Sequence, residues 1–76
     1  MFYNEYAMII YVKLKDPSNT VYFQSIIGTY SHLAWTRTED AKEGLIKIIS
    51  TNERVDEVKE LLRNLKDEIE FEEVKI

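Results

Sequence analysis

The sequence predicts a single α+β domain of βαββαβ order, a two-layer sandwich in which two helices cover one face of a four-stranded antiparallel sheet. Segments 6–14 and 45–50 are apolar, and the first of them alternates with the two-residue period of a strand. Segments 17–30 and 55–69 carry apolar residues at the three- and four-residue spacings of an amphipathic helix. A length of 76 residues leaves room for one domain, residues 1–76.

The first strand is expected over residues 6–14, with both faces mostly apolar, which predicts a central position in the sheet. Asp16 followed by Pro17 predicts a helix start, because the carboxylate accepts from free backbone N–H groups and proline presets the first helical φ. The helix is expected over 17–30. Its predicted buried residues are Val21, Phe23, Ile26, Ile27 and Tyr30.

A hairpin is expected next. Residues 33–38, LAWTRT, alternate and are polar enough for an edge strand. Residues 39–44 form a turn in which Gly44 can adopt a positive φ. The strand that follows, 45–50, is apolar on both faces and is expected in the centre of the sheet.

Ser50 and Glu53 match a capping box, with Thr51 as an alternative cap, so a second helix is expected after them. Its predicted apolar stripe is Val55, Val58, Leu61, Leu62, Leu65 and Ile69. The glutamate-rich segment 69–76 is expected to form a short, charged edge strand. Because β-α-β crossovers are right-handed, both helices fall on one face, and the ferredoxin-like arrangement with sheet order 4-1-3-2 follows.

Composition excludes several classes of function. The formal charge of −4, from 14 acidic and 10 basic side chains, gives no general attraction to phosphate backbones, so no nucleic acid partner is expected. No apolar run approaches the length of about 20 residues that spans a membrane, and the N-terminus does not resemble a secretory signal, so no membrane partner is expected. The absence of cysteine excludes disulfides and thiolate chemistry and favours a cytoplasmic location.

Four stretches then point to a family: YVKLKDP, IIGTYSHLAWTRT, EGLIKI and VDEVKELLRNLKDEI. Together they resemble a small uncharacterised bacterial family, domain of unknown function 4911, over about residues 11–69. The resemblance implies an ACT-like fold and no assigned activity. The family tends to have glycine where this chain has His32, and a helix often ends in a left-handed residue, so His32 is expected to have a positive φ. ACT domains usually carry a glycine in the loop after the first strand, whereas the loop here is KDPSN.

His32 and Trp35 are the only histidine and tryptophan of the chain. One histidine, without a cysteine or a second histidine, predicts no catalytic residue, no metal site and no cofactor. An enzyme would need a polar cluster in a pocket around His32 and Arg37. The register of the hairpin decides whether Trp35 faces the helices or the open side of the sheet, and tryptophan is common in both settings. An exposed tryptophan would join a patch fit for dimerisation or for ligand stacking, made of Ile9, Tyr11, Trp35 and Ile49.

The function expected from these observations is that of a cytoplasmic, non-catalytic binding or regulatory module. It is expected to form a homo-oligomer, a dimer, through an edge strand or the open sheet face, because the core is small and the second apolar face would otherwise be wet. The alternative is a small-molecule, amino-acid-like sensor of the ACT type. Its ligand would lie at the positive end of the first helix, near Asp16, Ser18 and Asn19. A small enzyme is the third and least favoured hypothesis.

Overall fold

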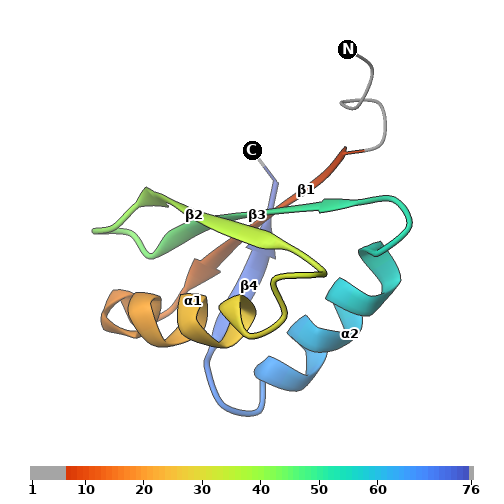
Figure 1. Cartoon of the computed structure of the whole chain (residues 1–76). Coiled ribbons are helices and arrows are strands. Elements are labelled where there is room, and N and C mark those ends of the chain that lie inside the picture. The colour runs from red at the N-terminus through yellow and green to blue at the C-terminus, as the bar shows by residue number, and fades with distance from the viewer. Residues whose placement is uncertain (1–6, 76) are drawn as a thin grey trace.

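The computed structural model describes residues 7–75, and their side chains from residue 8 onward. The elements follow the predicted order (Figure 1). They are β1 (Ala7–Leu14), the 3-10 helix η2 (Pro17–Asn19), α1 (Thr20–Gly28), β2 (Trp35–Asp40), β3 (Leu45–Thr51), α2 (Val55–Leu65) and β4 (Phe71–Val74). The predicted strand residues Tyr6 and Ile76 lie outside the described part of the chain.

The four strands form one antiparallel sheet of order β2-β3-β1-β4. This is the predicted order 4-1-3-2 read from the opposite edge, with β1 and β3 in the centre. Among residues 7–75, both helices lie on the same side of the sheet, and no helix of this range covers the other side (Figure 1). Neither helix among residues 7–75 is long and apolar enough to cross a membrane.

The core lies between the sheet and the helices. Alternate residues of the two central strands point into it, and they meet one apolar side of each helix. Phe23 of α1 contacts Phe71 of β4 edge to face, with ring centroids 5.3 Å apart. The buried apolar residues are Ile10, Val12, Leu14, Phe23, Ile27, Leu33, Ala34, Ile46, Ile48, Val58, Leu62, Leu65, Ile69 and Phe71.

The first helix is shorter than predicted. Asp16 caps the 3-10 turn as expected, because its carboxylate accepts from the Ser18 backbone N–H at 3.0 Å. The predicted buried stripe is wrong at two positions, since Val21 is 74% exposed and Tyr30 is 40% exposed. Val21 lies two residues from Phe23, which places it on the opposite side of the helix. Tyr30 lies beyond the end of α1, where helical spacing no longer applies.

The chain between α1 and β2 also differs from the prediction. No residue other than glycine has a positive φ within residues 7–75, so the left-handed backbone predicted for His32 is wrong. Successive tight turns close this segment instead, with backbone hydrogen bonds from Tyr30 to Ile27 at 2.8 Å and from Leu33 to Tyr30 at 2.7 Å. The strand therefore begins at Trp35, two residues later than predicted, and Leu33 is buried in the core.

The capping box predicted from Ser50 and Glu53 does not form. Strand β3 continues to Thr51, and α2 begins at Val55 after Arg54, which makes no side-chain capping bond. Ser50 is a buried strand residue whose hydroxyl donates to the Leu33 carbonyl at 2.6 Å. The hydroxyl therefore joins the sheet to the segment before β2 and is not available to the helix.

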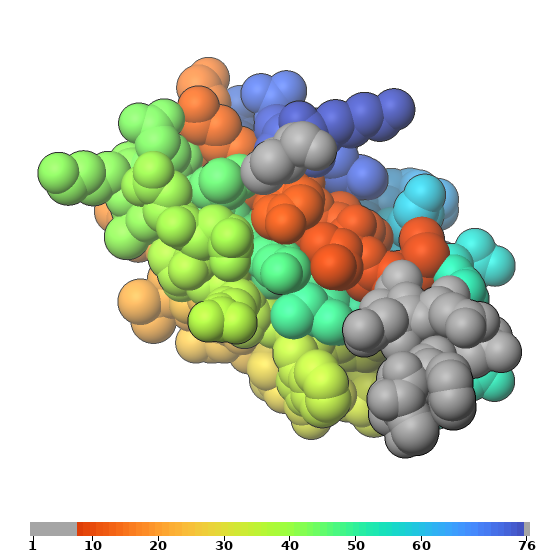
Figure 2. Space-filling view, turned by 90° about the horizontal axis from the view of Figure 1, so that it is seen from above, coloured from red at the N-terminus to blue at the C-terminus, as the bar shows by residue number. Residues whose placement is uncertain are grey.

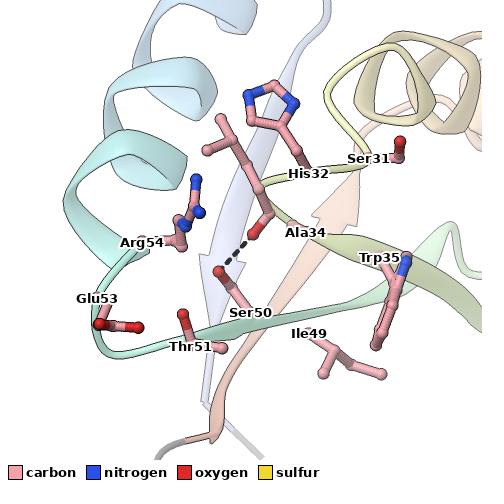
Figure 3. A pocket seen from close by; sticks show the side chains of 10 residues that line it. Ser31, His32, Ala34, Trp35, Ile49, Ser50, Thr51, Glu53 and Arg54 are labelled. Carbon is pink, nitrogen blue, oxygen red and sulfur yellow. Dashed lines mark hydrogen bonds between the residues drawn. The ribbon is translucent and has the colours of Figure 1, made fainter.

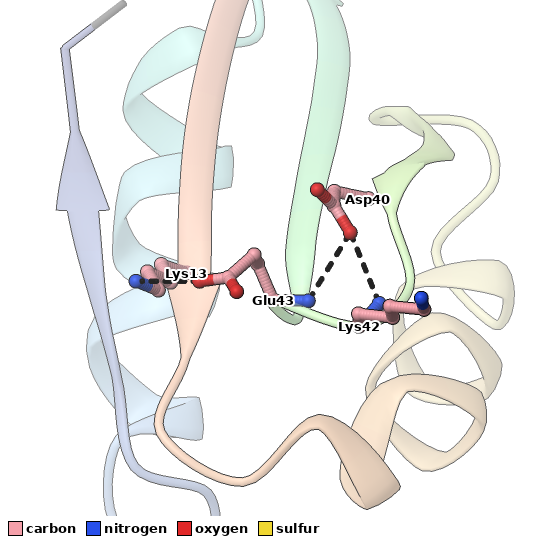
Figure 4. A network of polar contacts seen from close by, with 4 residues as sticks. All are labelled: Lys13, Asp40, Lys42 and Glu43. Carbon is pink, nitrogen blue, oxygen red and sulfur yellow. Dashed lines mark hydrogen bonds and ion pairs between the residues drawn. The ribbon is translucent and has the colours of Figure 1, made fainter.

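The β2–β3 turn forms as predicted around Gly44, which has φ of 70°. The Asp40 carboxylate accepts from the backbone N–H groups of Lys42 at 3.1 Å and Glu43 at 3.2 Å (Figure 4). Glu43 also pairs with Lys13 of β1 at 3.2 Å (Figure 4). The turn is thus held both within the hairpin and against the neighbouring strand.

Candidate functional site

The open face of the sheet carries a row of three apolar residues from three neighbouring strands. Trp35 lies opposite Ile49, and Ile49 lies opposite Ile9. Trp35 is 68% exposed and Ile9 is 48% exposed. Figure 2 shows this side of the molecule, with β2, β3 and β1 next to one another. The sequence left two orientations for Trp35, and the structure places it on the open face; we call Trp35, Ile49 and Ile9 the apolar row.

The next row along the strands is basic and aromatic. Arg37 lies opposite Lys47, which lies opposite Tyr11. Neither Arg37 nor Lys47 takes part in the ion pairs found among residues 7–75, which join Lys13 to Glu43 and Lys15 to Glu70. Like charges directly opposite on neighbouring strands are unfavourable. The open face therefore places an unbalanced positive pair beside the apolar row, on a chain whose formal charge is −4.

The two edges of the sheet are poorly suited to pairing with another strand. The register of β2 against β3 shifts between Thr38 and Asp40, which makes the outer strand irregular. Strand β4 is only four residues long and exposes Glu72 and Glu73. Short strands, bulges and charges all discourage edge-to-edge pairing. The open face is therefore the better candidate for contact with another molecule.

The residues predicted to bind a ligand at the start of the first helix lie together, but they bond to one another. One oxygen of Asp16 accepts from the Ser18 backbone at 3.0 Å and from the Ser18 hydroxyl at 2.8 Å. These two hydrogen bonds hold the pKa of the Asp16 carboxyl below its ordinary value of 3.8, and the bond from the Ser18 hydroxyl has the larger effect. Asn19 donates its backbone N–H to the Asp16 carbonyl at 3.0 Å. The Asp16 carboxylate itself therefore already lies at the start of the first helix, where an amino-acid-like ligand was expected.

A cavity of about 310 Å³ lies at the opposite end of the sheet, between the turn before β2 and the start of α2. His32 and Arg54 contribute to its walls, and Ser50 holds the Leu33 carbonyl beside it (Figure 3). Arg37 does not line this cavity, because it lies one row further along the strands than Trp35, which does line it. The polar cluster of His32 and Arg37 that an enzyme would need is therefore not formed.

Sequence reasoning missed Arg54 and Glu53 as residues of this cavity, because it assigned the chain after Ser50 to a helix. The signal that could have placed them is the β-branched residue Thr51, which suits a strand and lies directly after Ser50, since β3 extends to Thr51. A longer strand moves the start of the helix to Val55 and leaves residues 52–54 as a turn beside the cavity. The residues that line the cavity are Ser31, His32, Leu33, Ala34, Trp35, Ile49, Ser50, Thr51, Glu53 and Arg54.

Comparison with protein-family models gives a match to "Domain of unknown function (DUF4911)" over residues 16–69. This span begins at the Asp16 cap and includes both helices and the β2–β3 hairpin, whereas β1 and β4 lie outside it. No curated protein and no solved structure matches the chain. Because the family model covers more than half of the sequence, the chain belongs to the family of domain of unknown function 4911.

Proposed function

We propose that this protein is a cytoplasmic, non-catalytic binding or regulatory module of ACT-like, ferredoxin-like type that self-associates through the open face of its sheet. The βαββαβ order and the sheet order support the fold type. The observation that carries the self-association is the apolar row, in which Trp35 is 68% exposed and Ile9 is 48% exposed. Contiguous exposed apolar patches of large area mark interaction surfaces, and we infer that this row is the centre of one.

The energetics favour a weak, concentration-dependent dimer. Fully burying one large apolar side chain contributes about 1.5–3 kcal/mol. Trp35 and Ile9 are half to two-thirds exposed, so two copies packed face to face would recover only part of that value for each of four side chains. Association costs at least about 4 kcal/mol in lost freedom of motion. The burial energy exceeds the cost of association by only a small amount, so the degree of association should change with protein concentration.

Sedimentation velocity over a range of concentrations tests the proposal. The parent protein is expected to shift from monomer towards dimer, while Trp35→Glu stays monomeric because it places a carboxylate in the apolar row. Val21→Glu is the matched control, since Val21 is also exposed, at 74%, but lies on α1 away from the sheet face. A parent protein that stays monomeric at high concentration, or a Trp35→Glu variant that associates like the parent, would contradict the proposal.

A second candidate function, that of a small-molecule sensor, is supported by the cavity beside His32 and Arg54. Its volume of about 310 Å³ is at the lower end of the range for ligand sites. A thermal-shift panel of amino acids and nucleotides separates the two candidates, because a ligand that binds the native state raises the melting temperature. Stabilisation lost in Arg54→Gln would support the sensor, whereas a panel without any shift would leave self-association as the function.

A further inference from the structure

The open face of the sheet holds two neighbouring cations that are not neutralised within the described chain. Arg37 of β2 and Lys47 of β3 lie directly opposite each other, where like charges repel. The ion pairs found among residues 7–75 involve neither of them. Asp40, further along β2, is engaged in the turn, because its carboxylate accepts from backbone N–H groups at 3.1 and 3.2 Å. A group that lies over this pair should therefore carry negative charge.

The apolar row lies directly beside this basic pair. Side chains on one face of a strand recur about every 6.8 Å, which is the spacing from Trp35 to Arg37 along β2 and from Ile49 to Lys47 along β3. Trp35 is 68% exposed. Tryptophan and arginine are among the residue types that carry most of the binding energy in protein–protein interfaces. An occupant that fits both rows carries apolar side chains next to carboxylates.

Nucleic acid and a second copy fit this pattern less well than an acidic protein partner. The formal charge of −4 gives the chain no general attraction to a phosphate backbone. Two of the three residues in the apolar row are isoleucines, which offer no ring on which a base can stack. A second copy carries the same positive pair, so it adds like charge to the face and neutralises nothing.

The backbone of the sheet favours a helix as the occupant. The N–H and C=O groups of the strands point to neighbouring strands, so the open face offers no backbone partner to a chain that lies on it. An occupant must therefore satisfy its own backbone groups, as a helix does. One helical turn rises about 5.4 Å, close to the spacing of about 6.8 Å between the two rows. A helix along the strands can thus place apolar side chains of one turn on the apolar row and carboxylates of the next turn on Arg37 and Lys47.

We propose that the open face binds an acidic amphipathic helix of a partner protein, whose apolar side chains cover Trp35 and Ile49 and whose carboxylates pair with Arg37 and Lys47. The planar guanidinium of Arg37 can hold a carboxylate through two parallel hydrogen bonds, which sets the register of the helix. This inference goes beyond the proposed self-association and does not depend on it. Both contacts use the same face, so the partner helix displaces the weak dimer.

A synthetic peptide tests the proposal through the fluorescence of Trp35, which is the only tryptophan of the chain. The peptide is alanine-based and about 20 residues long, so that it is helical in water. It carries one turn of leucines flanked on both sides by turns of glutamates, and the matched control peptide has glutamine in place of each glutamate. Binding is measured at low protein concentration from the shift of the Trp35 emission to shorter wavelength. The glutamate peptide is expected to bind about tenfold more tightly than the glutamine peptide at low salt, and this difference should shrink at high salt because exposed ion pairs are screened.

Variants of the basic pair separate this inference from self-association. Arg37→Gln combined with Lys47→Gln should weaken binding of the glutamate peptide about tenfold without weakening the dimer, because it removes like charges from the face. Arg63→Gln is the control, since Arg63 is an exposed cation on α2 and should not affect binding. Circular dichroism confirms that each variant is folded. Equal binding of the two peptides, no binding of either, unchanged binding by the double variant, or tighter binding of a single-stranded oligonucleotide than of the glutamate peptide would overturn the proposal. A parent protein that sediments only as a monomer would contradict self-association alone.

Discussion

Gly44→Ala should destabilise the fold strongly, because two separate features of position 44 require glycine. Gly44 has φ of 70°, a left-handed conformation that costs a residue with a Cβ about 1–2 kcal/mol. A Cβ built there would lie 3.0 Å from the Leu14 carbonyl oxygen and 3.1 Å from the Leu14 Cβ. Leu14 cannot easily move away, since it is fully buried in β1 and its N–H donates to the Gly44 carbonyl at 2.8 Å.

The magnitude follows from these contributions. Overpacking of this kind costs about 1–3 kcal/mol in addition to the backbone strain. Replacing glycine also restricts the unfolded chain, which offsets about 0.4–1 kcal/mol. The net loss of unfolding free energy is therefore about 1–5 kcal/mol, and the centre of this range is about 2–3 kcal/mol. In a domain of this size each kcal/mol corresponds to roughly 4–8 °C, so the melting temperature should fall by about 10–20 °C.

Thermal and urea unfolding followed by circular dichroism measures this effect, at one protein concentration because self-association would alter the apparent stability. Gly28→Ala is the control, since Gly28 ends α1, has no positive φ, and an added Cβ meets nothing within 4 Å. Alanine in a helix is favoured over glycine by up to about 1 kcal/mol, so this variant should be equally stable or slightly more stable. A Gly44→Ala variant that loses less than about 4 °C, or no more than Gly28→Ala, would refute the reasoning.

Two further predictions concern hydrogen bonds. Ser50→Ala removes the hydroxyl that donates to the Leu33 carbonyl at 2.6 Å, and the unsatisfied buried carbonyl should lower the unfolding free energy by about 1–3 kcal/mol. The control Ser25→Ala changes an exposed serine and should alter the unfolding free energy by less than about 0.5 kcal/mol. Equal urea midpoints for the two variants would contradict this prediction. The lowered pKa of Asp16 means that its ionised form stabilises the fold above the ordinary value of 3.8 and that this contribution is lost as the pH falls through the lower folded pKa. An NMR titration of the Asp16 carboxyl should therefore give a midpoint below 3.8, and Ser18→Ala should raise it; an unchanged midpoint in that variant would refute the assignment of the hydrogen bonds.

The arrangement of the sheet could be predicted because two strands are apolar on both faces and two are not. The first and third strands thereby take the centre, and right-handed crossovers place the helices on one side. The ends of elements were less predictable, as Ser50 shows. Its spacing to Glu53 is that of a helix cap, yet pairing with Met8 keeps Ser50 in β3. The pairing of β3 with β1 therefore outweighs the local helix-capping signal at Ser50.

The candidate site was predicted in composition but not in arrangement. Ile9, Tyr11, Trp35 and Ile49 were expected to share a patch if Trp35 were exposed, and the structure places all four on the open face. Tyr11 lies in the second row with Lys47, and the positive pair with Arg37 was not anticipated. Opposite residues on neighbouring strands are far apart in sequence, so only the register reveals that two cations meet.

The register itself depends on one irregular position in the hairpin. Next to the turn, Asp40 lies opposite Leu45, and continuing that register along β2 would place Trp35 opposite Ser50, whose hydroxyl points into the core. The shift between Thr38 and Asp40 leaves Glu39 as an extra residue in β2, and from Thr38 onward the pairing is displaced by one position. Trp35 consequently lies opposite Ile49 and faces outward. A displacement of one residue exchanges the two faces of a strand, so this bulge is what exposes the tryptophan and completes the apolar row.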